Sequence, residues 1–243
     1  MHCFARLRTI AATLALILMT QPTLAGTILS PIAVINNTIG NYKGIAGFPA
    51  NTDETPMFNQ SGLSLSFTSG ATDFAAYIAS NPTHIGGTPE IGNGWISPAY
   101  CPCTGILDFD LGANYSIKQM ALWNMAANSG ANVAEISLYS STTVDFANPT
   151  AVGSFTNPEM PDDNRPRAPY QATVFDLDDL DDSVGRYVRL QIHTYYDAYL
   201  VSEIGEIAFD VSAVPLPPML WLFAAACFGI LSAGRPQRTA LPS

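Results

Sequence analysis

The stretch "GILDFDLGANYSIKQMALWNM", Gly105 to Met125, decides the fold class. Its first part alternates, with Ile106, Asp108 and Asp110 on one side and Leu107, Phe109 and Leu111 on the other. A second alternating run begins at Ser116. A period of two residues is typical of β-strands, because successive side chains point to opposite faces of a sheet. The stretch therefore predicts two strands, residues 105–112 and 116–125.

Short runs of the same kind continue toward the C-terminus, rich in Val, Ile, Phe and Tyr and separated by Gly, Asn, Pro or Asp clusters. They cover residues 134–141, 151–155, 171–177, 185–196 and 205–211. Many short strands with turn residues between them favour an all-β sandwich or barrel. In the run 185–196, Val188, Leu190 and Ile192 are predicted to face the core, and Arg189, Gln191 and His193 the solvent.

The first third of the chain is less regular. Residues 69–80, "SGATDFAAYIAS", predict one or two helical turns with Thr72 as N-cap. Phe74, Tyr77 and Ile78 would form the inner side of this helix. The Gly- and Asn-rich segments 36–48 and 83–95 predict loops. Loops at one end of a sandwich are where ligands usually bind, although such segments are equally well explained as plain crossings.

The N-terminal residues 1–25 have the composition of a secretory signal peptide. Arg6 and Arg8 precede the apolar run Ile10–Met19, and small residues precede Gly26. This order predicts export with cleavage after Ala25. The alternative is a retained membrane anchor, for which the run is short, since a span takes about 20 residues.

The body that remains, residues 26–212, is long enough for one domain with its own core. All 20 acidic residues lie between Asp53 and Asp210, and only six basic residues accompany them, so the formal charge of this body is −14. Such a surface repels phosphate backbones, which argues against nucleic acid as a partner. Acidity fits a solvated extracellular protein or one that holds divalent cations.

Two cysteines fall in this body, Cys101 and Cys103 in "AYCPCTG". Exported proteins meet oxidising conditions, which favours a local disulfide between them. Half of a metal site or an intermolecular link are the alternatives. A metal site would need two more ligands, and no second C-x-C or C-x-x-C motif supplies them.

The order of several motifs resembles the discoidin, or F5/8 type C, branch of the galactose-binding-like domains. "WISPAYCPCTGILDFDLGANYSIKQMALWN" is followed by "GRYVRLQI" and "GEIAFDV" in the family's order, and the resemblance covers Met57 to Val211. It implies an eight-stranded jelly-roll β-sandwich. Loops at one end of that fold hold carbohydrate, a lipid headgroup or protein.

The C-terminal segment "VPLPPMLWLFAAACFGILSAGRPQR" is similar to the VPLPA variant of the PEP-CTERM sorting signal. Val214, Pro215, Leu216, Pro217 and Arg235 carry the resemblance, and Pro218 departs from it. The resemblance implies an exosortase-type processing enzyme as partner, in the inner membrane of a Gram-negative bacterium.

Physical arguments agree with this interpretation of the C-terminus. Residues 215–234 could span a membrane as a helix, with Arg235 and Arg238 held in the cytoplasm. We therefore expect a sorting segment over 213–238 and a tail over 239–243. The alternative is an ordinary single-span anchor.

Catalytic motifs are missing from the sequence. Only His84 and His193 remain in the body, without G-x-S-x-G, H-E-x-x-H or a phosphate loop, so no enzyme is expected. The carboxylate run Asp176–Asp182 predicts either a calcium loop or, more simply, a solvated turn. The family resemblance implies a structural calcium at Asn59 and Glu206. Its alternative is a Glu206 satisfied by backbone groups or an arginine.

Sugar recognition requires aromatic faces and nearby polar groups. Trp95, Tyr195, Tyr196 and Tyr199 are the candidates for ligand contact, and each could instead pack within the fold. Trp123 lies in a predicted strand and is expected in the core.

The combined expectation is an exported, non-enzymatic protein that passes through the inner membrane to the cell surface, the extracellular matrix or the medium. There it would bind polysaccharide or a neighbouring surface through its sandwich-end loops. The alternatives are a passive coat or spacer protein, and a hydrolase with an unfamiliar site.

Overall fold

The computed structural model describes residues 26–43, 53–85, 92–101, 103–125, 131–159, 169–177, 183–196 and 201–214. The chain divides after Ala213 into two units, and the sandwich belongs to the first of them. The predicted signal peptide, the sorting segment beyond Val214, most of the carboxylate run 176–182 and Tyr199 lie outside the described residues. Within the described part, no helix combines the length and hydrophobicity that a membrane crossing requires.

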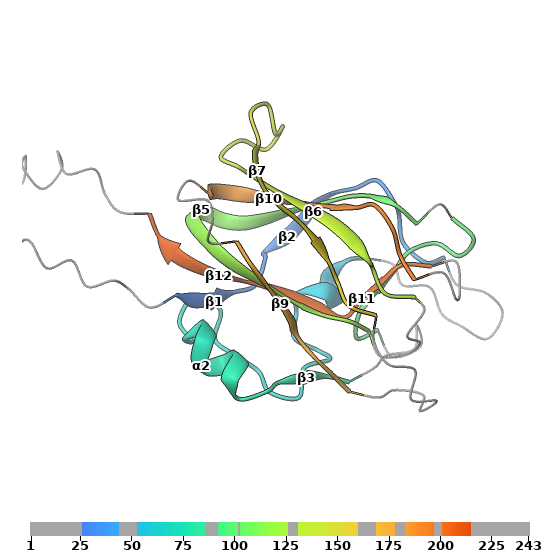
Figure 1. Ribbon diagram of the computed structural model, residues 1–243, viewed down its shortest axis with the longest axis horizontal. Helices are drawn as coiled ribbons and strands as arrows, with labels where there is room; N and C mark the ends of the chain where they lie inside the picture. The colour runs from blue at the N-terminus through green and yellow to red at the C-terminus, as the bar shows by residue number, and fades with distance from the viewer. Residues whose placement is uncertain are drawn as a thin grey trace, which may run out of the picture. The chain divides into compact units, whose positions relative to one another are not determined.

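A single bent strand, β5 (Gly105–Trp123), belongs to both layers of the fold. Its first half pairs with β2 (Ala33–Asn37) and β10 (Val184–Ile192). Its second half pairs with β9 (Thr173–Asp176) and β12 (Glu206–Ala213). The main sheet thus folds over on itself into a sandwich (Figure 1).

The prediction of two strands over 105–125 was wrong. The chain bends near Gly112, which has φ of 86°, but it does not leave the sheet. Tyr115 and Ser116 remain in register with Gly185 and Val184 of β10 across the bend. Continued pairing with β10 therefore keeps both halves in one strand.

One layer has the strand order β2–β5–β10–β6–β7, with β6 at Glu135–Ser141 and β7 at Thr150–Thr156. The other has the order β9–β5–β12–β1, with β1 at Thr27–Leu29. Every one of these pairs is antiparallel. The main sheet counts eight strands, so the prediction of an all-β sandwich is confirmed.

Alternating side chains of the two layers form the core. Val188, Leu190 and Ile192 are at most 2% exposed, as predicted from the run 185–196. The facing layers meet at Phe109 and Phe209, whose rings lie edge to face with centroids 6.5 Å apart. Each such buried side chain contributes about 1.5–3 kcal/mol through the area it removes from water.

Helix α2 (Phe74–Ala79) covers the outer face of the second layer. Phe74 and Tyr77 are buried there, and the Tyr77 ring lies 6.4 Å from that of Trp123, which is a core residue as predicted. The N-cap prediction was wrong by one residue. The Asp73 carboxylate accepts the Ala76 N–H at 2.7 Å. The Thr72 hydroxyl instead accepts the backbone N–H of Thr68.

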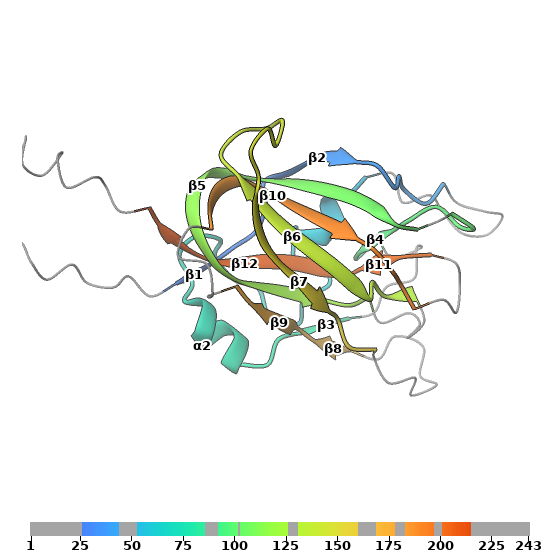
Figure 2. The ribbon, with the colours of Figure 1, turned by 45° about the horizontal axis from the view of Figure 1, so that its top comes forward.

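Several short elements complete the fold. A 3-10 turn, η1, covers Thr55–Met57. Two small sheets pair β3 (Thr83–His84) with β8 (Tyr170–Gln171), and β4 (Trp95–Ile96) with β11 (Glu203–Ile204). Strands β4 and β11 lie on the side away from the start of β1 and the end of β12 (Figure 2).

We call this side the loop end. It is formed by residues 38–43, 95–101, 103–104, 123–125, 131–134, 193–196 and 201–205.

Candidate functional site

A hollow of about 210 Å³ lies on the outer face of β6, β7 and β10, next to the loop end. Strand register assembles it, because Ser137 pairs with Ser154 on one side and Gln191 on the other. Its lining residues come from the start of β6, the end of β7 and the residue after β10: Glu135, Ile136, Ser137, Ser154, Phe155, Thr156 and His193.

Polar groups converge at the centre of this hollow. The Ser137 hydroxyl lies 2.8 Å from His193 Nε2 and 2.7 Å from the Ser154 hydroxyl. Ser137 is only 6% exposed, whereas His193 and Ser154 are exposed. The buried Ser137 hydroxyl therefore holds the accessible imidazole and hydroxyl groups of these two residues in place. Phe155, next to Ser154, pairs with Ile136, so its ring faces the core side of the sheet, where it lies 5.4 Å from that of Phe175.

This arrangement suits a small ring that carries hydroxyl groups. Pockets for drug-sized ligands begin at about 300 Å³, so the hollow fits one sugar ring rather than a larger ligand. Hydroxyl and imidazole groups can donate to and accept from sugar hydroxyls, and a carboxylate can accept from them. Sequence reasoning identified His193 only as an outward side chain, because its neighbours Ser137 and Ser154 meet it through strand pairing.

Trp95 is not a ligand contact, contrary to one of the two interpretations of the sequence. Its side chain is fully buried in strand β4, and its indole N–H donates to Asn41 Oδ1 at 2.7 Å. A buried ring has no face left for a sugar. The packed alternative therefore holds for Trp95.

Tyr195 and Tyr196, which follow His193, are half-buried. The Tyr196 hydroxyl donates to the Asn157 carbonyl at 2.7 Å, and its backbone N–H donates to the Asn132 carbonyl at 3.0 Å. Tyr195 forms a β-bridge with Val133. Tyr196 is therefore held as a packing residue, and Tyr195 keeps a partly exposed ring two residues from His193.

The calcium position implied by the family resemblance is partly built. Glu206 is fully buried; one carboxylate oxygen accepts the Gln60 N–H at 2.9 Å, and the other has no hydrogen-bond partner among the described residues. Burial raises the pKa of Glu206 well above its ordinary value, and the Gln60 hydrogen bond opposes this effect. Such a carboxylate fits a cation site.

The second predicted ligand fits less well. Asn59 is exposed, and its Oδ1 accepts the Ser61 N–H at 2.9 Å, so it offers a neutral oxygen only. The described residues also hold no cluster of three or more His, Cys, Asp or Glu side chains. Of the two predicted ligands, Glu206 alone could therefore supply a carboxylate to calcium.

Two more buried ionisable groups lie near the loop end. Burial raises the pKa of Glu203, on β11, to about 8. Burial also lowers the pKa of His84 to about 4, although the Asn93 carbonyl, 2.8 Å from its Nε2, favours the charged form. His84 is fully buried and packs closely on Gly62 and Gly205, so it serves the core.

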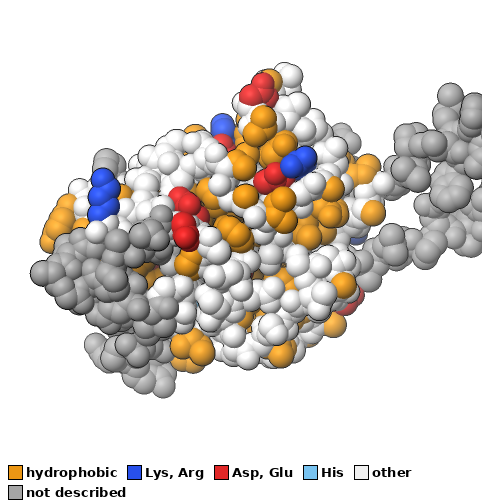
Figure 3. Space-filling model, turned by 180° about the vertical axis from the view of Figure 1, so that it is seen from behind, with side chains coloured by type: hydrophobic (Ala, Val, Ile, Leu, Met, Phe, Trp, Pro, Cys, Tyr) orange, Lys and Arg blue, Asp and Glu red, His pale blue; other side chains and the backbone are white. Residues whose placement is uncertain are grey.

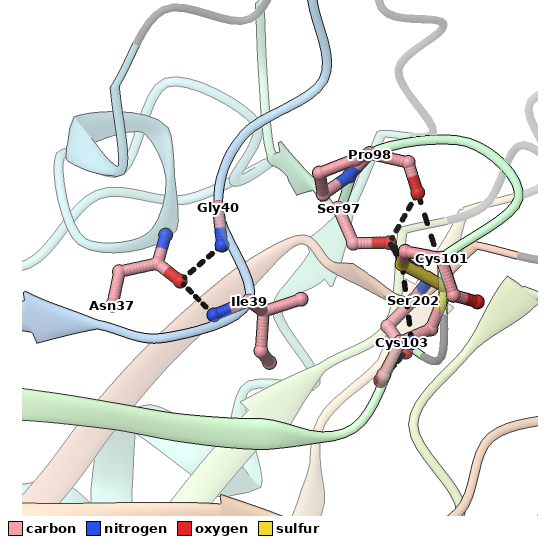
Figure 4. Close-up of a disulfide and its surroundings, with 8 residues drawn as sticks. All are labelled: Asn37, Ile39, Gly40, Ser97, Pro98, Cys101, Cys103 and Ser202. Carbon is pink, nitrogen blue, oxygen red and sulfur yellow. Dashed lines mark hydrogen bonds between the residues drawn. A yellow bond between two sulfur atoms is a disulfide. The ribbon is translucent and has the colours of Figure 1, made fainter.

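Cys101 and Cys103 are joined by a disulfide, with Cα atoms 5.0 Å apart (Figure 4). Ser202 fastens this loop to the rest of the loop end. Its N–H donates to the Ser97 hydroxyl at 2.8 Å, and its own hydroxyl donates to the Cys103 carbonyl at 2.7 Å. The neighbouring loop is ordered by Asn37, whose Oδ1 accepts two backbone N–H groups.

Basic side chains are few on the face shown in Figure 3, and some of them lie directly beside acidic ones. Two of the arginines form ion pairs: Arg186 pairs with Asp110, and Arg189 pairs with Asp108. Both pairs are bidentate, with all N–O distances between 2.7 and 2.9 Å.

Comparison of the sequence with family models and with curated proteins gave no match. The similar solved structures include family 32 carbohydrate-binding and F5/8 type C domains. One is CBM32-3 from a family 31 glycoside hydrolase of Clostridium perfringens, with 17% identity over 49% of this chain and 75% of that one, and a TM-score of 0.37.

A second is the family 32 module of C. perfringens NanJ in complex with galactose, with 11% identity over 48% of this chain and 74% of that one, and a TM-score of 0.35. A third is the F5/8 type C domain of a Bacteroides fragilis protein, with 11% identity, 50% and 74% coverage, and a TM-score of 0.36. In each case the likeness extends over about half of the present chain.

Proposed function

We propose that this protein is an exported, non-enzymatic binding protein that holds extracellular polysaccharide through the hollow beside its loop end. The observation that carries the proposal is the convergence of Ser137, Ser154 and His193 in a hollow the size of one sugar ring. The resemblance of the sequence to discoidin domains supports the same ligand class.

The charge of the body favours a neutral polysaccharide over an acidic one. It contains 20 acidic residues and only six basic ones, and two of the basic residues, Arg186 and Arg189, are paired with aspartates. An anionic polymer would meet repulsion across this surface. Glu135 in the hollow adds to that repulsion at the site itself.

Export and sorting complete the proposal. The signal peptide would deliver the body across the inner membrane, and an exosortase-type enzyme would process the VPLPA-like segment before release to the surface, matrix or medium. The described geometry supports such an attachment. Thr27 pairs with Val211, so the first and last strands of the sandwich lie side by side, and their outer ends point away from the loop end.

Affinity electrophoresis against soluble galactan, mannan and β-glucan, with alginate and polygalacturonate as acidic counterparts, tests the binding. We expect retardation by at least one neutral polymer, and its loss in Ser137→Ala and His193→Ala. Val144→Ala, an exposed change in the turn at the far end of β6, is the matched control. Absence of retardation by every polymer would instead favour a passive coat or spacer.

A hydrolase is the second candidate, because a Ser137 hydroxyl 2.8 Å from His193 Nε2 is the geometry of a nucleophile and its base. Among the described residues, however, no carboxylate accepts a hydrogen bond from the His193 ring to orient it. We therefore expect no turnover of p-nitrophenyl esters or glycosides above the Ser137→Ala background. Turnover that depends on Ser137 would favour the hydrolase.

Mass spectrometry of the protein recovered from cells tests export and sorting. We expect peptides from residues 1–25 and from Trp221 to Ser243 to be missing. Detection of the C-terminal peptides in the surface fraction would favour a plain single-span anchor.

A further inference from the structure

Tyr100 is exposed in an unusual way. Its side chain is 85% exposed, the highest value among the large hydrophobic residues described. Its φ is 58°, a left-handed conformation that costs a residue with a Cβ free energy. The fold thus places a large aromatic ring in water on a strained backbone, and neither feature contributes to the core.

The loop that carries Tyr100 is fastened at several points. The disulfide begins at the next residue, and Cys103 is only 1% exposed. Ser202 hydrogen-bonds to both Ser97 and Cys103, on the two sides of Tyr100. A ring on such a support loses little conformational entropy when a ligand covers it. Ala99 also packs against a cluster of buried side chains, Tyr42, Ile96, Met125, Ala131 and Val201.

We propose that Tyr100 is a second sugar-contact residue, which stacks on a ring of the same polysaccharide chain whose neighbouring ring occupies the hollow. This inference rests on the proposed function and extends it to the length of the ligand. A tyrosine ring offers the flat apolar face that the C–H side of a neutral sugar requires, and its hydroxyl stays in water.

Strand register places the start of β5, which follows the Tyr100 loop, at the same end of one layer as the hollow. Ile192 of β10 pairs with Gly105 on one side and with Ile136, in the wall of the hollow, on the other. Neighbouring strands are about 4.8 Å apart, so Gly105 and Ile136 are separated by about 10 Å. Tyr100 precedes Gly105 by five residues. A ligand that spans the separation between Gly105 and Ile136 would contain more than one sugar.

Chain-length dependence of binding tests this inference on the full-length protein in mild detergent. Fragments of galactan and mannan, from one sugar to four, would be titrated by calorimetry. We expect the wild type to bind the four-sugar fragment about tenfold more tightly than the single sugar. Tyr100→Ala should lose this gain and keep the single-sugar affinity, whereas Tyr100→Phe should keep both. Val144→Ala again serves as the control.

Removal of the disulfide supplies a second arm. The double substitution Cys101→Ser/Cys103→Ser should lower the affinity for the four-sugar fragment when Tyr100 is present. In a protein that already carries Tyr100→Ala, the double substitution should leave this affinity unchanged, because the disulfide acts through the tyrosine. Tyr100→Ala with an unaltered four-sugar affinity would overturn the inference while the proposed function stands. Failure of the wild type to bind any fragment or polymer would reject the proposed function itself.

Discussion

Glu203 makes a quantitative test of the structure possible. It is 4% exposed on β11, and one carboxylate oxygen has no hydrogen-bond partner among the described residues. Burial raises its pKa from 4.5 to about 8. At pH 7 the unfolded chain carries this carboxylate ionised, whereas the folded protein keeps it protonated.

The sign of the pH dependence follows from linkage. When the pKa of a carboxyl is raised in the folded state, that group does not lower the free energy of unfolding below pH 4.5. It lowers the free energy of unfolding progressively as the pH rises from 4.5 toward 8. Each pKa unit corresponds to about 1.4 kcal/mol, so the cost at pH 7 is on the order of 3 kcal/mol. Glu203→Gln keeps the size of the side chain and removes this cost.

Urea unfolding followed by the fluorescence of the buried Trp95 and Trp123 measures the effect. We expect Glu203→Gln and the wild type to be equally stable near pH 4 and the variant to be more stable at pH 7 and above. Glu159→Gln, at an exposed position, should follow the wild type at every pH. A stability difference for Glu203→Gln that stays constant from pH 4 to 8 would refute the reasoning, since Glu203 would then be ionised in the folded protein.

Three further predictions concern other buried or linked groups. If calcium occupies the Glu206 site, a chelator should lower the Tm by about 5–10 °C, as expected for saturating ligand, and Glu206→Gln should abolish this response. Asp108→Asn should lower the free energy of unfolding, measured in urea, by about 3 kcal/mol, because Arg189 loses a bidentate partner that is only 3% exposed. A loss below about 1 kcal/mol would mean that water takes the place of the Asp108 carboxylate. Reduction of the Cys101–Cys103 disulfide should cost about 2 kcal/mol or less by the same measurement, because the closed loop is very short, and a larger loss would show that the disulfide supports the core.

Strands with a clear alternation of side chains were predictable from the sequence. The run from Val184 to Ile192 is an example, because burial of one face fixes both the period and the facing of Val188 and Leu190. The continuation of β5 through its bend was not predictable, because Gly112 and its neighbours have the composition of a turn. Only the pairing of Tyr115 with Gly185 shows that the strand continues.

The candidate site was less predictable than the fold. Ser137, Ser154 and His193 carry no motif, and they meet because β6 pairs with β7 and β10 in one register out of several. Trp95 shows the opposite case. A tryptophan in a glycine-rich segment suggested a ligand contact, but Asn41, 54 residues away, holds its indole inside the fold. A two-residue strand such as β4 exists only because it pairs with another strand, here β11. It is too short to show an alternating pattern of side chains in the sequence.

The neighbouring positions of β1 and β12 determine how the protein would respond to mechanical load. Thr27 and Val211 pair at the edge where both strands leave the sandwich. Force applied between these two ends would open the β1–β12 pairs one after another. Force between Ala213 and the loop end would instead run along β12, whose pairs with β5 extend from Glu206 to Ala213 and would share the tension. A molecule tethered by its C-terminal side and pulled by a captured polymer would therefore be loaded in its stronger direction.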